Sequence, residues 1–507
     1  MPGYEQTAVD RRDHTAVVCQ SESLTYGELD DRSSQLAHLL RSAGAVAGSR
    51  VAIMLPNSIE FVECLAATAK LEVLSLTLNW HLRAEELSWI LGDAEPSVLV
   101  ADRDLADCVE QANAEHGVPV VWVGEDYERQ LAEAAAATAL ADRSFEYAWP
   151  TTWPVLYTSG TSGRPKGVVH GSTADPAIMR MAQDGLSAMW GYTAEDVHLV
   201  AGPMYHAGPA GYANMTLYLG GTVVVMDSWS PTEFLHLVET HHVTTTFLTP
   251  AHFIRLLELP AAEFTRRNLS SLRHVIHAGA PCPATVKHDI IDRLAPAEIW
   301  ELYGMSEGGA TRVSPTEWLD RPGTVGRPWP GVELRIVDTE EPAHELPTGA
   351  DGLIYVKPAM GRFHYHNDAD KTDAAWRDGA FTVGDVGHVD DDGYLYVTDR
   401  ISDMVIRAGV NVYPREIEEL LHRHPDVVDC AVFGIPDDRD GEHLKAVVET
   451  RGPVDTDELV AWCRAHLDPF KVPSEIERCD TLPRDPNGKV LKRHLRDQAW
   501  ARAGRQV

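Results

Sequence analysis

Lysine is scarce in this chain: nine of its 507 residues are lysine, against 35 arginines. Basic charge is scarce as well, because 44 Lys and Arg residues face 76 Asp and Glu residues, which gives a formal net charge of −32 at pH 7. A protein this acidic repels nucleic acids and anionic membrane surfaces unless it carries a local basic patch. We therefore expect no nucleic acid and no anionic membrane among its partners.

The sequence also lacks the segments that mark membrane spans, secretion and cysteine-bound metal. No apolar run approaches the roughly 20 residues that cross a bilayer, and the first residues contain no basic region followed by an apolar stretch. The seven cysteines are scattered, and no two have the CxxC spacing of a zinc or redox site. We expect free thiols, no membrane span and a location in the cytoplasm.

What the sequence does contain is an alternation of short β-branched runs with helical patterns. Hydrophobic residues make up 44% of the chain, as in globular proteins, and 507 residues exceed what one compact core holds. The pattern predicts strands at 51–55, 96–101, 119–123, 222–226, 244–248, 273–277 and 298–302, and helices at 58–71, 84–91, 231–241, 250–257 and 283–294. Such alternation favours parallel sheets covered by helices.

The pattern changes twice towards the C-terminus. After about residue 322, short strands joined by Gly, Pro and Asp turns are typical of an antiparallel or barrel-like subdomain, and after Arg400 helical and strand patterns mix. The sequence therefore predicts an α/β protein with a large N-terminal domain, built from two doubly wound parallel sheets and a β-barrel-like subdomain, and a small mobile α+β C-terminal domain. The predicted bounds are 1–400 for the large domain, 401–403 for a hinge and 404–507 for the small domain.

The strongest motif is Leu-Tyr-Thr-Ser-Gly-Thr-Ser-Gly-Arg-Pro-Lys-Gly-Val-Val, at 156–169. A strand-like segment leads into a loop where glycines let the backbone approach a phosphate and hydroxyls donate hydrogen bonds. It is not a Walker A loop, because two residues separate Gly163 from Lys166 and no Ser or Thr follows the lysine. The motif predicts a phosphate-binding loop made of Thr158, Ser159, Gly160, Thr161, Ser162, Gly163 and Lys166.

This loop resembles the phosphate loop of the adenylate-forming superfamily, which includes acyl-CoA synthetases, firefly luciferases and the adenylation domains of peptide synthetases. Further motifs that resemble this family follow in its order along nearly the whole chain, as in bacterial ligases for fatty, steroid-like and terpenoid acids. The resemblance implies an ATP-dependent ligase that converts a carboxylic acid to an acyl-adenylate and then transfers the acyl group to coenzyme A. It also implies Mg²⁺, which prefers oxygen ligands and bridges phosphates.

The resemblance assigns the rest of the nucleotide to three motifs. His-Ala-Gly-Ala-Pro at 277–281 resembles the loop that lines adenine, Tyr303 would stack on the base, and Asp385 with Arg400 would contact the ribose. The family usually has threonine at the position of Ser306, so a hydroxyl is kept and a methyl is lost. The residues implied in nucleotide binding are Ala278, Gly279, Ala280, Pro281, Glu301, Leu302, Tyr303, Gly304, Met305, Ser306, Asp385 and Arg400.

Three catalytic residues follow from the same resemblance. Lys489, in Pro-Asn-Gly-Lys, would reach the carboxylate and the α-phosphate and offset the charge that builds in the transition state. Glu307 would bind Mg²⁺, with the hydroxyl of Thr158 as a second ligand. His206 would orient the acid.

The second half-reaction is assigned to the small domain. Gly409 matches a family glycine that lets the pantetheine arm of coenzyme A pass, and Lys471 lies where the small domain meets the nucleotide of coenzyme A. The hinge residue is Ser402, where the family usually has Asp or Lys. This departure could change the rate of a domain rotation that alternates the two half-reactions.

The acid should be apolar and bulky. The segments 207–213 and 308–310 contain mainly small residues and no lysine or arginine that could pair with a second charge. We expect the acid to be bound by His206, Ala207, Ala210, Gly211 and Gly308.

Three alternatives stay open at this point. The acceptor could be a carrier protein in place of coenzyme A, the enzyme could be specialised for one half-reaction because of Ser306 and Ser402, or the chain could be a nucleotide sensor without catalysis. Nothing in the sequence indicates the oxygen chemistry of a luciferase. A monomer and a homodimer both remain open.

Overall fold

The structure is a computed structural model that describes residues 5–137, 155–158, 165–171, 176–341, 344–359, 361–437, 439–486 and 488–502. The chain divides into two compact units. Unit 1 consists of Met1–Leu248, Phe264–Ile276 and Met360–Ala374. Unit 2 consists of Thr249–Glu263, His277–Ala359 and Ala375–Val507.

One sheet of unit 1 has the strand order β18-β8-β7-β4-β3-β5-β6. Its central strands pair in parallel, whereas β8 pairs antiparallel with β7 and β18 pairs antiparallel with β8. The strands are β3 (Arg50–Met54), β4 (Leu74–Thr77), β5 (Val98–Asp102), β6 (Val120–Val123), β7 (Val155–Thr158), β8 (Lys166–His170) and β18 (Phe363–Tyr365). The end of the phosphate-loop motif lies in β8, so the motif is next to the edge strand β18 of this sheet.

Helices cover both faces of this sheet. Val51 and Ile53 of β3 lie in one apolar cluster, and Ala52 and Met54 lie in another, since successive side chains of a strand point to opposite faces. The first cluster contains side chains of α2 (Tyr26–Ser42) and α3 (Ile59–Lys70), and the second contains side chains of α4 (Ala84–Ala94) and α5 (Ala106–Asn113). Burial on both faces explains why this strand is a continuous apolar run.

The other strands of unit 1 follow the order β12-β11-β9-β10-β1-β2. The pairs β1–β10, β10–β9 and β11–β9 are parallel, and β1–β2 is an antiparallel hairpin. The strands are β1 (Thr15–Cys19), β2 (Glu22–Thr25), β9 (Val197–Val200), β10 (Thr222–Val225), β11 (Thr245–Leu248) and β12 (His274–His277), whose last residue belongs to unit 2. The remaining helices of unit 1 are α1 (Glu5–Asp10), α6 (Tyr127–Ala137), α7 (Pro176–Trp190), α8 (Ala207–Leu219) and α9 (Pro231–Thr240).

Unit 2 contains mainly antiparallel strands. The hairpin β13–β14 pairs with β15, and a second sheet has the order β19-β20-β17-β21-β22, with β16 on β17. These strands are β13 (Glu298–Met305), β14 (Gly308–Val313), β15 (Arg327–Pro328), β16 (Glu333–Val337), β17 (Gly352–Lys357), β19 (Trp376–Arg377), β20 (Ala380–Phe381), β21 (Asp385–Val389) and β22 (Leu395–Arg400). The helices α10 (Pro250–Leu257), α12 (Ala284–Leu294) and α13 (Pro315–Asp320) belong to the same unit, and α11 (Ala261–Thr265) and α14 (Ala369–Ala375) have residues in both units.

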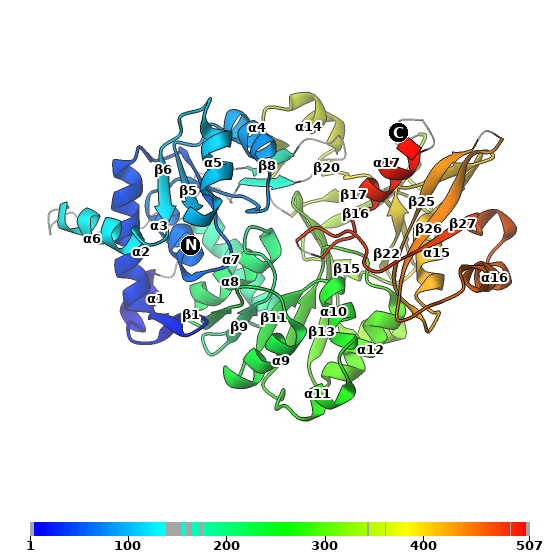
Figure 1. Ribbon diagram of the computed structural model, residues 1–507, viewed down its shortest axis with the longest axis horizontal. Coiled ribbons are helices and arrows are strands. Elements are labelled where there is room, and N and C mark those ends of the chain that lie inside the picture. The colour runs from blue at the N-terminus through cyan, green and yellow to red at the C-terminus, as the bar shows by residue number, and fades with distance from the viewer. Residues whose placement is uncertain are drawn as a thin grey trace. The chain divides into compact units, whose positions relative to one another are not determined.

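The C-terminal part of unit 2 is an α+β arrangement around a small apolar core. β25 and β26 form the orange hairpin in Figure 1, and β27 pairs in parallel with β26. The elements are β23 (Val405–Arg407), β24 (Val410–Val412), α15 (Pro414–Leu421), β25 (Val427–Asp437), β26 (Gly441–Thr450), α16 (Thr456–His466), β27 (Glu475–Cys479) and α17 (Lys492–Arg502). Ile417, Leu421 and Leu459 of the helices pack on Val432 and Leu444 of the hairpin.

The predicted fold class is confirmed: the chain is α/β with several sheets, a large N-terminal part and a smaller C-terminal part. The ends of β25 and β26 lack a local apolar pattern, and they are strands because they pair with each other across the hairpin. The two units do not meet at residue 400. The domain bounds 1–400, 401–403 and 404–507 therefore stay predictions. Within the described residues, no helix is long and apolar enough to cross a membrane.

A buried ion pair ties α2, α3 and α6 together in unit 1. The guanidinium of Arg32 contacts the fully buried carboxylate of Glu63, which also accepts a 2.7 Å hydrogen bond from the Tyr127 hydroxyl. The same guanidinium forms a bidentate pair with the exposed carboxylate of Glu128, at 2.7 and 2.9 Å. One arginine thus has one buried and one exposed acidic partner.

This geometry predicts unequal effects of removing the two interactions. Arg32→Met should lower the free energy of unfolding by about 3–5 kcal/mol, because it leaves the buried Glu63 without its cation. Glu128→Gln, the matched control, should lower it by less than about 1 kcal/mol, because exposed pairs contribute little. Equilibrium urea unfolding measures both values, and equal losses in the two variants would contradict the assignment.

Candidate active site

The motif Glu301–Glu307 forms one strand and the tip of the β13–β14 hairpin. Met305 pairs with Gly308 and Tyr303 with Thr311, so that Ser306 and Glu307 are the two-residue connection. The Glu307 side chain is buried, with 7% of its surface exposed. At Gly309 of the hairpin a Cβ atom would lie 2.2 Å from the indole of Trp329, so this ring packs directly on the backbone there.

Tyr303, Asp385 and Arg400 are joined by hydrogen bonds. The Tyr303 hydroxyl donates to Asp385 Oδ2 at 2.7 Å, and Arg400 Nε donates to Asp385 Oδ1 at 2.9 Å. Asp385 and Arg400 are also cross-strand partners on β21 and β22, so the sheet register fixes their distance. Burial, followed by the charge of Asp385, raises the pKa of Tyr303 well above its ordinary value, which keeps the hydroxyl protonated as a donor.

A small pocket brings the loop after β12 next to the terminal lysine. Gly279 has a φ of +89° and is exposed, as is Pro281, whereas Ala278 is buried. The residues that line the pocket are Thr249, Ala251, Gly279, Ala280, Gly488 and Lys489. All six belong to unit 2, and two of them lie more than 200 residues away from the others along the chain. The fold therefore unites two motifs that the sequence could only place separately.

Lys489 follows a tight turn that its own backbone closes. The Asp485 N–H donates to the Lys489 carbonyl at 2.9 Å, and the Lys489 N–H donates to the Asp485 carboxylate at 2.9 Å. Gly488, with a φ of +84°, supplies the left-handed residue of this turn. The side chain keeps exposed surface, yet protein atoms displace part of the solvent around the amine, and this burial lowers its pKa, with Arg400 as the second cause.

Lys166 lies on β8 in unit 1, opposite Thr158 of β7. Its amine is 3.0 Å from the Tyr365 hydroxyl and 4.2 Å from the centre of that ring, on the neighbouring strand β18. The ends of the phosphate-loop motif therefore form a regular strand pair. The intervening predicted residues Ser159, Gly160, Thr161, Ser162 and Gly163 lie outside the described residues.

The predicted acid-binding residues of unit 1 lie at the start of α8. His206 is the N-cap residue, and its ring centre is 4.6 Å from that of Tyr205. Ala207, Ala210 and Gly211 follow at helical spacing i, i+3 and i+4 and share one face of the helix, where Ala207 and Gly211 are exposed. A row of small, partly exposed residues leaves space along this face.

The opposite face of α8 is held by aromatic packing. The Tyr212 ring stacks on that of Phe247 at 5.3 Å between centres. A Cβ atom at Gly208 would lie 2.6 Å from the Phe247 ring, so only glycine permits this approach. The helix is therefore fixed from behind while its small-residue face stays open.

The comparisons with known proteins decide the family. The AMP-binding enzyme family matches residues 4–361, and the AMP-binding enzyme C-terminal domain matches residues 416–489. The chain belongs to the AMP-binding enzyme family. It is an ATP-dependent, AMP-forming acid–thiol ligase, as its resemblance to adenylate-forming enzymes implied, and Mg²⁺ is typical of such ligases.

Relatives and solved structures match the ligase over almost its whole length. Fatty acid–[acyl-carrier-protein] ligase ScoC of Streptomyces coeruleorubidus is 33% identical over 500 residues, which cover 97% of this chain and 95% of that protein. Feruloyl-CoA synthase of Amycolatopsis sp is 34% identical over 497 residues, or 95% of each chain. ATP-bound MatB from Rhodopseudomonas palustris superposes with a TM-score of 0.86 at 31% identity, covering 98% of both chains.

The donor set of the ligase fits a magnesium ion that is held mainly by phosphates. In the part of the chain that the structure describes, no group of three or more His, Cys, Asp and Glu side chains could hold a metal ion. Mg²⁺ commonly keeps water and phosphate ligands and takes one or two protein carboxylates. The buried Glu307 at the hairpin tip would supply such a carboxylate, and the ion when bound would neutralise phosphate charge.

The ligase residues predicted for coenzyme A lie on the C-terminal part. Gly409, with a φ of +81°, lies in the two-residue turn between β23 and β24. The Lys471 amine is 2.8 and 2.9 Å from the carboxylate oxygens of Glu416, so any anion it meets competes with that carboxylate. Ser402 is exposed, and its carbonyl accepts a 3.1 Å hydrogen bond from Arg496.

Sequence reasoning missed Lys287, which supports the Glu301 motif from behind. Its fully buried amine is 2.6 Å from Glu301 Oε2 and 4.9 Å from the centre of the Trp318 ring. His277 Nε2 lies 3.7 Å from the same carboxylate, and burial, followed by the charge of Lys287, lowers the His277 pKa well below its ordinary value. The sequence feature that could have identified Lys287 is its place on the apolar face of a predicted helix, since it shares a face of α12 with Ile290.

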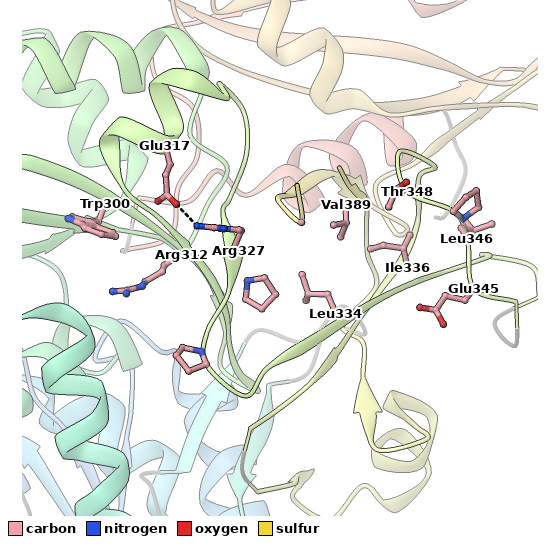
Figure 2. Close-up of a pocket in the computed structure, with 14 residues that line it drawn as sticks. Trp300, Arg312, Glu317, Arg327, Leu334, Ile336, Glu345, Leu346, Thr348 and Val389 are labelled. Atoms are coloured by element: carbon pink, nitrogen blue, oxygen red, sulfur yellow. Dashed lines mark hydrogen bonds and ion pairs between the residues drawn. The ribbon is translucent and has the colours of Figure 1, made fainter. Parts of the chain in front are cut away.

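A larger pocket of about 750 Å³ contains none of the predicted site residues (Figure 2). Trp300, which lines it, precedes Glu301 on β13, so their side chains point to opposite faces of the strand. Arg312 lies over the Trp300 ring at 5.2 Å, and Arg327 pairs with Glu317 at 3.1 Å. Pocket size alone would thus point to the face of β13 opposite the Glu301 side chain and away from the predicted site residues.

Because the pKa of Lys489 is lowered, we expect the activation of the acid by ATP to become slower at alkaline pH. Only the protonated amine offsets phosphate charge, so kcat/KM for ATP should fall as pH rises through a value below the ordinary 10.5. Because kcat/KM reports the free enzyme, bound triphosphate does not mask this pKa. Acid-dependent pyrophosphate exchange measured across the pH range tests the expectation.

Lys489→Arg is the matched variant for this measurement. A guanidinium stays charged throughout the range, so the alkaline fall should disappear even if the maximal rate is lower. An identical alkaline fall in both proteins would assign the titration to another group.

Proposed function

We propose that this ligase activates an apolar, bulky carboxylic acid and that Lys489 is the catalytic group of the activation step. The observation that carries the proposal is the pocket shared by Lys489 with Gly279 and Ala280, which resemble the adenine loop. A cation beside that loop would lie close to a bound nucleotide. The lowered pKa of its amine supports the same role, because an ammonium that has lost part of its solvation interacts more strongly with an incoming anion.

In the first half-reaction the carboxylate oxygen attacks the α-phosphorus of ATP, and pyrophosphate leaves. Both reactants are anions, so positioning and charge neutralisation provide most of the acceleration. We assign the α-phosphate and the carboxylate to Lys489, the outer phosphates to Lys166 and its loop, and Mg²⁺ to Glu307. His206 is assigned to the orientation of the acid.

The ribose and adenine are assigned to Tyr303, Asp385 and Arg400. An ionised carboxylate accepts several hydrogen bonds, and Asp385 receives one each from Tyr303 and Arg400. Its remaining lone pairs are available to ribose hydroxyls, while the Tyr303 ring offers a face to the base.

In the second half-reaction the thiolate of coenzyme A attacks the acyl carbon, and AMP leaves. Lys489 has no part in this step and occupies space near the nucleotide, so we propose a rotation of residues 404–507 about the hinge at 401–403 between the steps. Gly409 and Lys471 are assigned to the pantetheine arm and the nucleotide of coenzyme A.

The class of acid is inferred from small, uncharged side chains. The face of α8 with Ala207, Ala210 and Gly211 has no charged residue, and we add Gly308 as the small residue that follows Glu307. An acid with a second charge would lack a partner there, whereas apolar surface is released from water on binding. The fatty acid and feruloyl groups named for two relatives agree with this class.

A carrier protein is the second candidate acceptor. The name of ScoC, which matches 97% of this chain, specifies an acyl-carrier-protein as its acceptor. Purified enzyme with ATP and either dodecanoic or ferulic acid, given coenzyme A or a phosphopantetheinylated carrier protein, separates the two. Thioester formation on coenzyme A supports the proposal, and thioester formed only on the carrier protein supports the second candidate.

Lys489→Ala should separate the half-reactions. Loss of one preorganised charge contact in the transition state costs roughly 100- to 1000-fold, so acid-dependent pyrophosphate exchange should fall by that factor. Conversion of a synthetic acyl-adenylate to acyl-CoA should persist, because that step does not use the amine. Lys357→Ala is the control, since Lys357 only forms an exposed pair with Glu333, and undiminished exchange in Lys489→Ala would refute the proposed role.

Gly308→Trp should narrow the range of acids. A Trp side chain in a pocket that takes a bulky acyl group should lower kcat/KM for dodecanoic acid relative to propionic acid by roughly 10- to 100-fold, through a clash of about 1–3 kcal/mol. Gly308→Ala is the control for backbone strain, because both variants add a Cβ atom at a φ of +159°, while Ala adds only an ordinary 3.5 Å contact with the Phe381 ring. An unchanged ratio of the two acids in a folded Trp variant would mean that Gly308 does not line the pocket.

A further inference from the structure

A chain of charged groups connects α10 with the turn that carries Lys489. On α10, Arg255 Nη1 is 2.8 Å from Glu449 Oε1 of β26 and 3.0 Å from Glu258 Oε2. The Glu449 side chain is buried, with 4% of its surface exposed, whereas Glu258 is more exposed. Arg255 thus pairs with two carboxylates: that of Glu258, directly after its own helix, and the buried one of Glu449, nearly 200 residues further along the chain.

The buried carboxylate of Glu449 also holds the segment that leads to the catalytic turn. Its Oε2 accepts a 3.2 Å hydrogen bond from the Leu482 N–H and lies 3.6 Å from Arg484 Nη2. Arg484 in turn donates from Nη1 to the carbonyl of Gly488 at 3.1 Å and pairs with the buried Asp429. The network therefore ends on the carbonyl directly before Lys489.

The catalytic turn touches the same face of α10 one turn earlier. A Cβ atom built on Gly488 would lie 2.5 Å from the Cβ of Ala251, which shows how closely this turn approaches the helix. Ala251 and Arg255 are four residues apart and so lie on one face of α10. The turn therefore contacts this face of α10 directly at Ala251, and the Arg255–Glu449 pair connects it to the same face one turn later through Arg484.

From this arrangement we propose that Arg255 and Glu449 are positioning residues that hold the Lys489 turn against α10 during acid activation. The inference rests on the proposed role of Lys489 and adds to it the contact that sets the amine in place. Neither side chain has to touch a substrate. The pair would have to separate when Lys489 withdraws for the second half-reaction, so it favours the first half-reaction only.

The test compares the two half-reactions in the full-length chain. Arg255→Gln removes the charge and keeps much of the side-chain length, so acid-dependent pyrophosphate exchange should fall by roughly 10- to 100-fold, as expected for a displaced catalytic group. Thioester formation from the synthetic adenylate of the same acid should be unchanged or faster. Dodecanoic or ferulic acid serves as the probe, whichever the wild-type chain turns over faster.

Glu258→Gln is the matched control, because it removes the other partner of the same guanidinium and leaves the contact to β26 intact. This variant should keep the wild-type ratio of the two half-reaction rates. Arg255→Lys should restore much of the exchange, since it restores the charge. The double variant with Glu449→Gln should lose little more than Arg255→Gln alone, because interacting residues are not additive.

Two outcomes would overturn the positioning role. Equal losses in both half-reactions would show a general structural effect, and unchanged exchange in Arg255→Gln would show that the pair does not set the position of Lys489. Lys489→Ala in the same assays keeps the two proposals apart. If Lys489→Ala abolishes exchange and Arg255→Gln does not, only the positioning role of Arg255 is refuted. Undiminished exchange in Lys489→Ala would refute the catalytic role of the lysine itself.

Discussion

The repulsion between two anions is the constraint on which this active site depends. A carboxylate must approach the triphosphate of ATP, and it must do so in a protein with a net charge of −32 that itself repels both. Cations must therefore be fixed and close to the reacting atoms. Lys489 lies beside Gly279 and Ala280, which we assign to adenine, whereas Lys287 and Lys471 are engaged by carboxylates.

Local patterns allowed much of the fold and the motif positions to be predicted. Apolar runs such as β3 and helices such as α10 follow from periodicity within a few residues. What could not be predicted depends on contacts between distant segments. The meeting of Lys489 with Gly279 joins positions 210 residues apart, and the pairing of Lys287 with Glu301 needs α12 packed on β13 before either residue has a partner.

Two ion pairs with a buried carboxylate in unit 2 each join a helix to a strand. Lys287–Glu301 joins α12 to β13, and Arg255–Glu449 joins α10 to β26. Such pairs add little net stability, because the desolvation of both charges offsets much of their attraction. Their effect is on register: a helix shifted by one residue would leave a buried carboxylate unpaired. We infer that both pairs restrict where the neighbouring motif, the tip of β13 or the Lys489 turn, can lie.

Asp385 is a further buried carboxylate that fixes the position of neighbouring side chains, here in the proposed nucleotide site. Its carboxylate accepts from Tyr303 and Arg400, and an ionised carboxylate has about four lone-pair sites. The ribose hydroxyls that we assign to Asp385 would therefore bind without displacing either donor, and the Tyr303 ring would keep its orientation. Because one carboxylate holds the ring proposed to stack on the base, is assigned to the ribose and anchors the arginine that lowers the Lys489 pKa, it would link the proposed sites of base, sugar and catalytic amine electrostatically. A change at Asp385 would consequently alter all three together.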